Sequence, residues 1–205
     1  MPHYTEMKIT VLFPTQTEAS LFSRDDVSTI ISGVGLTATA HATTRLIYQQ
    51  RPDLLIMAGI AGAYAHSGFK VGDVCLVSTE VEGDLGFFTP KGFVHLAHLP
   101  IDMEFERRHT LACPHLPAQP LFPLARGMSV NAAMAAFVDT SQIDLENMEG
   151  AAFFHTCLQE KQAFLELRAV SNFVDIHHDE WDMQGSVKAM TAGLHQLIDS
   201  LLLTP

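Results

Sequence analysis

The sequence predicts an α/β fold in which a central, mostly buried sheet lies between helices. Two observations carry this prediction: β-rich apolar runs alternate with helical segments over the first sixty residues, and glycine-rich breaks follow two of the predicted strands. The chain of 205 residues fits one domain with a core large enough to fold by itself. It contains no repeat, low-complexity tract or linker that would divide it.

Six apolar runs predict strands. Pro14 ends the first, and the third is apolar on both faces, as a buried parallel strand is. We expect the glycines at 59 and 62 to break this third strand at Ala58. In chain order the predicted strands span residues 9–13, 27–32, 53–58, 71–81, 124–130 and 164–171.

Three longer segments have the spacing of apolar residues that is typical of helices. They span residues 36–50, 147–160 and 187–203. A shorter helix is expected after Thr15, because Glu18 three residues later completes a capping box. Residues 83–101 are rich in Gly and Phe and predict a loop or lid.

The composition excludes several classes of protein. The net charge is −11, whereas binding to a phosphate backbone requires a surplus of Lys and Arg. No apolar run reaches the ~18 residues of a membrane span, and residues 1–8 lack the pattern of a signal peptide. We therefore expect a cytoplasmic protein with no nucleic-acid or membrane partner, in which residues 1–6 are an N-terminal extension of one domain, 1–205.

Cysteine and histidine patterns predict neither a disulfide framework nor a metal site. The three cysteines are widely spaced and form no CxxC pair. The eleven histidines are scattered, and only His177 and His178 are adjacent, which is not the spacing of ligands on one helix face.

Two glycine breaks follow predicted strands, Gly33-Val34-Gly35 and Gly59-Ile60-Ala61-Gly62. Ligands of open α/β sheets bind outside the carboxyl ends of strands, and glycine there lets a ligand approach the backbone. Neither break is a dinucleotide fingerprint, because position 38 is Ala. Ordinary strand-to-helix turns explain either break equally well.

Two charged residues stand at unusual positions. Glu149 begins a helix, where free backbone N–H groups stabilise an anion, either as a ligand-binding group or only as a partner of the helix dipole. Arg168 lies within an apolar strand, which is costly unless a carboxylate pairs with it, and Glu149 is the candidate. The alternative is an edge strand on which Arg168 faces water.

Taken in order, four segments resemble the nucleoside phosphorylase/nucleosidase superfamily over about residues 8–200. They are the strand and turn ending at Glu18, Gly59-Ile60-Ala61-Gly62, Met148-Glu149-Gly150-Ala151-Ala152 and Arg168-Ala169-Val170-Ser171-Asn172. Within the superfamily the chain looks most like the futalosine hydrolases, which are nucleosidases of menaquinone biosynthesis. The residues that suggest this are 71–74, 80–86, Val130-Asn131 and 168–172, with Trp181 downstream.

The resemblance implies a single-domain α/β/α sandwich with a central mixed, largely parallel sheet. It also implies a homo-oligomer, a dimer or higher, that binds a small-molecule nucleoside and uses no cofactor or metal. Glu18 would orient and deprotonate a water, Glu149 would bind the ribose hydroxyls, and Asn172 would face N7 and O6 of the base. The substrate-binding residues implied are Gly59, Ala61, Gly62, Val130, Asn131, Met148, Arg168, Ser171, Phe87 and Phe88.

Asn172 indicates which base leaves. In methylthioadenosine nucleosidases this position is Asp, which can protonate N7 of adenine. The Asn172 amide can instead donate to the N7 and O6 acceptors of a 6-oxopurine, so we expect hypoxanthine rather than adenine as the leaving base. The alternative is that Asn172 only caps a turn.

Residues 14–18 carry no cation and place Glu18 where a phosphate would bind, which favours hydrolysis over phosphorolysis. Phe87, Phe88 and Phe93 would pack on a 5′ aryl tail or, equally, anchor their loop. Three alternatives stay open: a methylthioadenosine/S-adenosylhomocysteine nucleosidase, a purine nucleoside phosphorylase and a nucleoside-binding protein without turnover.

Overall fold

The computed structural model describes residues 7–100, 109–133, 136–174 and 181–203. The strands of its main sheet are β1 (Ile9–Phe13), β2 (Val27–Ile31), β3 (Leu54–Ala63), β4 (Val74–Glu82), β7 (Leu111–Ala112), β8 (Leu124–Ser129), β9 (Leu145–Asn147) and β10 (Phe164–Phe173). The helices are α1 (Gln16–Ala19), α2 (Leu36–Gln50), α3 (Gly150–Gln159) and α4 (Met183–Leu203). Short 3₁₀ turns span Ala65–Ser67 and Leu96–His98.

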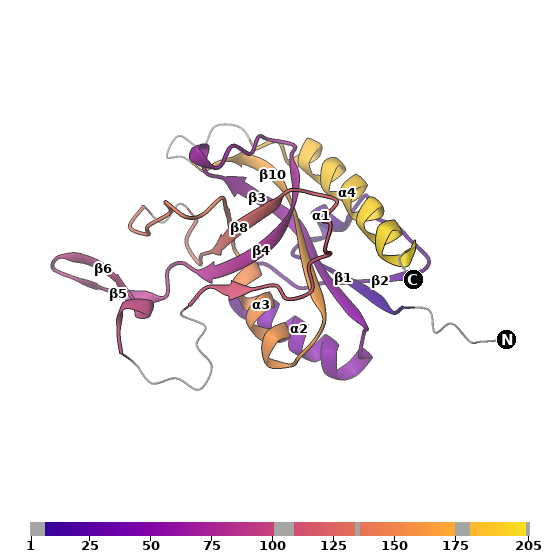
Figure 1. The fold of residues 1–205 in the computed structure, drawn as a ribbon, viewed down its shortest axis with the longest axis horizontal. Helices are drawn as coiled ribbons and strands as arrows, with labels where there is room; N and C mark the ends of the chain where they lie inside the picture. The colour runs from indigo at the N-terminus through magenta and orange to yellow at the C-terminus, as the bar shows by residue number, and fades with distance from the viewer. Residues whose placement is uncertain (1–6, 101–108, 134–135, 175–180, 204–205) are drawn as a thin grey trace.

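Helices cover the sheet from two sides (Figure 1). α2 packs against α3 on one side, and α4 packs on β10 and β3 on the other. The predicted α/β/α sandwich is thereby confirmed.

Two parallel groups of strands make up the sheet apart from β7, which pairs antiparallel with β4. β2, β1, β3 and β10 pair in parallel, as do β4, β8 and β9. Antiparallel pairs, β10 with β4 and β3 with β9, join the two groups. The expectation of a mixed, largely parallel sheet is therefore confirmed. Because β1, β3 and β10 run the same way, their carboxyl ends meet at one edge.

The predicted break after Ala58 is wrong, because β3 continues through the glycines to Ala63. Its glycine segment pairs with β10 in the register Arg168↔Gly59 and Asn172↔Gly62. A Cβ at Gly59 would lie 2.5 Å from Nη1 of Arg168. The glycine therefore makes room for a buried guanidinium within a continuous strand.

Other boundaries also differ from the sequence prediction, and β4 begins at Val74 rather than at residue 71. Residues 83–101 contain a two-stranded hairpin, β5 (Gly86–Thr89) and β6 (Gly92–His95), which projects from the body of the molecule (Figure 1). The short strand β9 precedes α3, so this helix begins at Gly150 rather than 147. α4 begins at Met183, four residues before the expected start.

The core lies between the sheet and its helices. Leu12, Ile56 and Met57 from the central strands are fully buried, as are Phe153 and Phe154 from α3. In the described part of the chain, no helix combines the length and the apolar character needed to cross a membrane.

Candidate functional site

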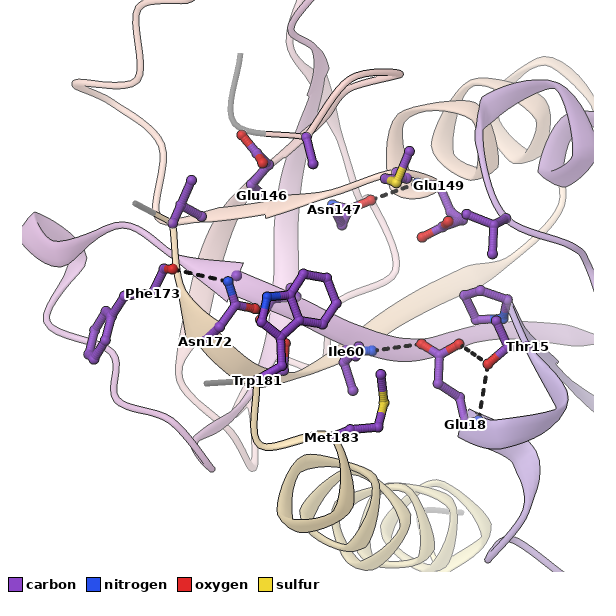
Figure 2. A pocket seen from close by; sticks show the side chains of 18 residues that line it. Thr15, Glu18, Ile60, Glu146, Asn147, Glu149, Asn172, Phe173, Trp181 and Met183 are labelled. Atoms are coloured by element: carbon purple, nitrogen blue, oxygen red, sulfur yellow. Dashed lines mark hydrogen bonds between the residues drawn. The ribbon is translucent and has the colours of Figure 1, made fainter. Parts of the chain in front are cut away.

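A cavity of about 250 Å³ lies where the carboxyl ends of β1, β3 and β10 meet. The turn after β9 and the start of α4 complete its wall. Seven of the residues predicted for the site line it: Glu18, Ala61, Gly62, Met148, Glu149, Ser171 and Asn172. In Figure 2, Glu18 and Glu149 lie at one end of the pocket and Asn172 lies at the other.

Glu18 is held at the start of α1 by half of the predicted capping box, because its carboxylate bonds the hydroxyl of Thr15 and not the backbone N–H of Thr15. The N–H of Glu18 donates to Oγ1 of Thr15 at 3.2 Å, and this hydroxyl donates back to Oε2 of Glu18 at 2.6 Å. Oε1 accepts the backbone N–H of Ile60 at 3.0 Å (Figure 2). Burial raises the pKa of Glu18 and outweighs the lowering by these hydrogen bonds. A carboxylate with a raised pKa is a stronger base towards a bound water.

Glu149 immediately precedes α3 and is also buried. Its Oε1 accepts the backbone N–H of Gly35 at 3.0 Å, and its Oε2 lies 3.3 Å from Nη1 of Arg168. Gly35 has φ +93°, a conformation that favours glycine. Both oxygens are fixed by one donor each, which leaves lone pairs for hydroxyl donors from a ligand.

Arg168 does not line the cavity but supports it from behind. Its side chain is fully buried, and its Nε donates to Oε1 of Glu166 at 2.7 Å. Nη1 donates to the carbonyl of Ile60 at 3.1 Å as well as to Glu149. The predicted pair of Arg168 with Glu149 is present, and the edge-strand alternative is wrong.

Asn172 lines the other end of the cavity, just after a register shift in β10. Its Oδ1 accepts the hydroxyl of Ser171 at 2.8 Å. Its Nδ2 donates to the carbonyl of Phe173 at 3.0 Å (Figure 2). The amide orientation is therefore set by the chain itself. One Nδ2 hydrogen remains for a ligand.

Five further predicted residues lie outside the cavity lining. Gly59 is covered by Arg168, and Val130 is buried beside Met128. Asn131 donates to the carboxylate of Asp84 from its backbone and from its side chain. Phe87 and Phe88 are exposed on the β5–β6 hairpin, so their predicted contact with substrate stays a prediction.

Five polar or aromatic residues of the wall were not among the predicted site residues: Glu146, Asn147, Trp181, Thr15 and Phe173. Glu146 accepts the hydroxyl of Tyr64 at 2.7 Å. Burial and this bond raise the pKa of Tyr64, so the phenol stays a donor. The signal for the first two was available, because they directly precede Met148-Glu149.

Within the described ranges, no group of three or more His, Cys, Asp or Glu side chains could hold a metal ion. His177 and His178 lie outside those ranges, as do residues 1–6, which were predicted to be an extension. The three cysteines are buried and free.

Comparison with known proteins defines the class. The sequence profile of the phosphorylase superfamily matches residues 15–202. A futalosine hydrolase from Thermus thermophilus is 30% identical over 185 residues, which cover 82% of this chain and 79% of that protein. The chain therefore belongs to the phosphorylase superfamily, and its relatives place it among the N-glycosyl hydrolases of that superfamily.

Solved structures have the same fold. The native futalosine hydrolase of Helicobacter pylori aligns with a TM-score of 0.77 at 15% identity, over 96% of this chain and 99% of that one. A methylthioadenosine/S-adenosylhomocysteine nucleosidase from Neisseria meningitidis, in complex with methylthio-immucillin-A, aligns with a TM-score of 0.73 at 19% identity. The alignment covers 95% of this chain and 99% of that one.

Proposed function

We propose that the cavity hydrolyses the N-glycosidic bond of a 6-oxopurine nucleoside, with futalosine as the substrate. The products would be hypoxanthine and dehypoxanthine futalosine. The observation that carries this proposal is the fixed amide of Asn172, at the end of the cavity opposite Glu18 and Glu149. The 30% identical relative, named a futalosine hydrolase, supports it.

Asn172 favours a 6-oxopurine because its Nδ2 can still donate a hydrogen bond to the base. After its bond to the Phe173 carbonyl, Nδ2 keeps one hydrogen, so the side chain can donate one hydrogen bond to a ligand. N7 and O6 of hypoxanthine are both acceptors, whereas adenine presents an amino donor at position 6. A site built to donate a hydrogen bond rejects a ligand that lacks the acceptor.

The opposite end suits a cationic sugar. Cleavage of a glycosidic bond passes through an oxocarbenium-like state, in which positive charge develops on the ribose. Glu149 would bind the ribose hydroxyls, and its negative charge would stabilise the transition state more than the substrate. Glu18 would accept a proton from the attacking water, while Asn172 donates to N7 of the leaving base.

Water is favoured over phosphate as the nucleophile. None of the described lining residues is Lys, Arg or His, whereas three of them are glutamates: Glu18, Glu146 and Glu149. The nearest guanidinium, Arg168, already pairs with Glu149 and Glu166. A phosphate beside these carboxylates would be repelled by about 1 kcal/mol or more at short range.

The proposal includes the setting of the enzyme. It would act in the cytoplasm, in menaquinone biosynthesis, as a homo-oligomer of one nucleosidase domain over 1–205. The exposed phenyl rings of Phe87 and Phe88 on the projecting hairpin support self-association. Analytical ultracentrifugation of the wild type beside a Phe87→Ser, Phe88→Ser variant tests this part.

The direct test is a base-release assay in phosphate-free buffer. Purified protein is incubated with futalosine, inosine or methylthioadenosine, and the bases are separated by chromatography. We expect hypoxanthine from futalosine at the highest kcat/KM, with little adenine from methylthioadenosine. Adenine as the main product would overturn the assigned role of Asn172. Release only after phosphate is added would make the enzyme a phosphorylase.

A further inference from the structure

A second polar cluster lies directly behind the cavity and is buried within the fold. Its members come from adjacent strands: Glu80 of β4, Ser129 of β8, Asn147 of β9, and Glu166 and Arg168 of β10. Asn147 alone among them also lines the cavity. Glu80, Ser129, Glu166 and Arg168 are each 0% exposed, so their charges and protons must be balanced within the cluster.

The charges do not balance if every carboxyl group is ionised. Arg168 pairs with Glu149 and Glu166, at 3.3 and 2.7 Å. In the described part of the chain, the hydrogen bonds of Glu80 go only to neutral groups. These are Nδ2 of Asn147 at 2.6 Å and Oγ of Ser129 at 3.0 Å. An ionised Glu80 would thus be a third buried anion sharing one cation.

The count of hydrogen atoms around Ser129 also indicates that Glu80 is protonated. Its Oγ lies 2.9 Å from Oδ1 of Asn147 and 3.0 Å from Oε2 of Glu80, but a hydroxyl has only one hydrogen to donate. The Asn147 amide cannot be reversed, because its Oδ1 accepts the backbone N–H groups of Glu149 and Gly150. If Glu80 lacked a proton, one of the two short oxygen–oxygen contacts would have no hydrogen in it.

We propose that Glu80 is a positioning residue that stays protonated in the folded enzyme, donates a hydrogen bond to Oγ of Ser129, and so holds the turn that carries Glu149. The functional part rests on the proposed nucleosidase activity. Ser129 then donates to Oδ1 of Asn147. Glu80 also accepts a hydrogen bond, which Nδ2 of Asn147 donates to its Oε1.

This network binds the backbone on which Glu149 is mounted. Oδ1 of Asn147 accepts the N–H groups of Glu149 and Gly150, at 2.9 and 2.8 Å. Oγ of Ser129 accepts the N–H of Ala151 at 2.8 Å. Three consecutive N–H groups at the start of α3 are therefore satisfied by two side chains that Glu80 contacts. Oδ1 of Asn147 also accepts Nη2 of Arg168 at 3.2 Å, so Glu80 and Arg168 orient Asn147 together. A shift of this turn would move the Glu149 carboxylate away from its place in the cavity wall.

The surrounding backbone is shaped to fit the Glu80 carboxyl group. A Cβ at Gly127 would lie 2.1 Å from Oε1 of Glu80, and a Cβ at Gly150 would lie 2.3 Å from it. Neither glycine has a positive φ, so close approach rather than backbone conformation explains them. Burial and the adjacent Glu166 raise the pKa of Glu80, against the opposing charge of Arg168.

The first test detects the proton without using activity. Infrared difference spectra compare wild type with Glu80→Gln at neutral pH, and Glu160→Gln is the surface control. We expect Glu80→Gln to remove a carboxylic-acid C=O stretching band, whereas Glu160→Gln removes only a carboxylate band. Loss of a carboxylate band in Glu80→Gln would overturn the proposal, even if the enzyme is active.

The second test uses the pH dependence of stability, read from urea midpoints. A carboxyl group whose pKa is raised in the folded state stabilises the fold below its unfolded pKa, and this contribution is lost as pH rises through the folded pKa. The stability of Glu80→Gln should therefore rise relative to wild type between pH 5 and pH 9. A Glu80→Gln variant that is less stable than wild type at pH 8, and recovers towards acid, would contradict a protonated Glu80.

The third test addresses positioning. Glu80→Ala removes both hydrogen bonds, and we expect kcat/KM to fall about 100-fold because Glu149 is misplaced. Glu80→Gln should restore most of this loss, since its amide can accept from Asn147 and donate to Ser129. If Glu80→Gln is as impaired as Glu80→Ala, the positioning role is wrong. If the wild type cleaves no nucleoside but the infrared result holds, the proposed function fails while the protonated Glu80 stands.

Discussion

Arg168 and Arg126 each hold a carboxylate, but in opposite surroundings. Arg126 on β8 forms a two-pronged pair with Asp144, with Nε and Nη2 at 3.0 and 2.8 Å from its two oxygens, and the arginine side chain is 44% exposed. Arg168 is 0% exposed, and its contact with Glu149 is longer, at 3.3 Å. Water can therefore replace hydrogen bonds of the Arg126 guanidinium, but it cannot reach those of Arg168.

The difference teaches that the cost of losing an arginine depends on what it leaves behind. Without the Arg126 side chain, Asp144 still accepts the backbone N–H of residue 126, at 2.8 Å. Without Arg168, Glu149 and Glu166 would be buried beside each other with no cation. The buried arginine thus ties the stability of the fold to the geometry of the site, and the surface arginine does not.

The largest effect is expected from Arg168→Met. Leaving the buried carboxylates of Glu149 and Glu166 without a cation should lower the free energy of unfolding by about 3–5 kcal/mol and abolish base release. Urea denaturation and the base-release assay measure the two effects. Arg126→Met is the matched control. A loss of less than 1 kcal/mol in Arg168→Met would mean that the carboxylates do not depend on Arg168.

Asn172→Asp tests the base end of the cavity. An aspartate oxygen would stand where Nδ2 now lies, 3.0 Å from the carbonyl of Phe173, a contact that favours a protonated acid. We expect the ratio of kcat/KM values to shift at least tenfold towards 6-aminopurine nucleosides. An unchanged ratio would remove Asn172 from base selection.

The pH profile tests the water-activating end. Because Glu18 acts as a base in its ionised form, kcat/KM should fall as pH drops through its pKa, which burial raises above the ordinary value of 4.5. Thr15→Val deletes a hydrogen bond that lowers this pKa and should move the acid limb to higher pH. If the acid limb of the kcat/KM profile moved to lower pH, or did not move, the group that titrates there would not be Glu18.

The smallest effect is expected from Arg126→Met itself. An ion pair whose arginine is 44% exposed contributes about 0–1 kcal/mol, and raised salt should reduce that further. Base release should equal that of the wild type. A loss approaching that of Arg168→Met would show that exposure does not separate the two arginines.

Much of the fold could be predicted because local pattern and tertiary structure agree. The strand at residues 9–13, the N-cap bond of Thr15 to the N–H of Glu18, and the helix at 36–50 all form as expected. The break at Gly59 was wrong because glycine there serves a packing need. The space it leaves is filled by Arg168 from a strand more than a hundred residues later.

The candidate site was predictable where one residue type was out of place. A buried arginine needs a carboxylate, and this requirement pointed to Glu149. Glu80 gave no such signal, because a glutamate in a strand of mixed polarity is ordinary on a half-exposed face. Only the pairing of β4 with β8, and of β8 with β9, brings it against Ser129 and Asn147.

The most direct test of the central claim compares binding and turnover in Glu18→Gln. Equilibrium binding of futalosine to the variant is measured by calorimetry, and base release is followed by chromatography. Glu160→Gln is the control for loss of a surface carboxylate. We expect Glu18→Gln to bind futalosine within a few-fold of the wild-type KM and to lose about 10²–10⁴-fold in kcat. Hypoxanthine release at a rate close to that of wild type would contradict the assignment of Glu18 as the group that activates water.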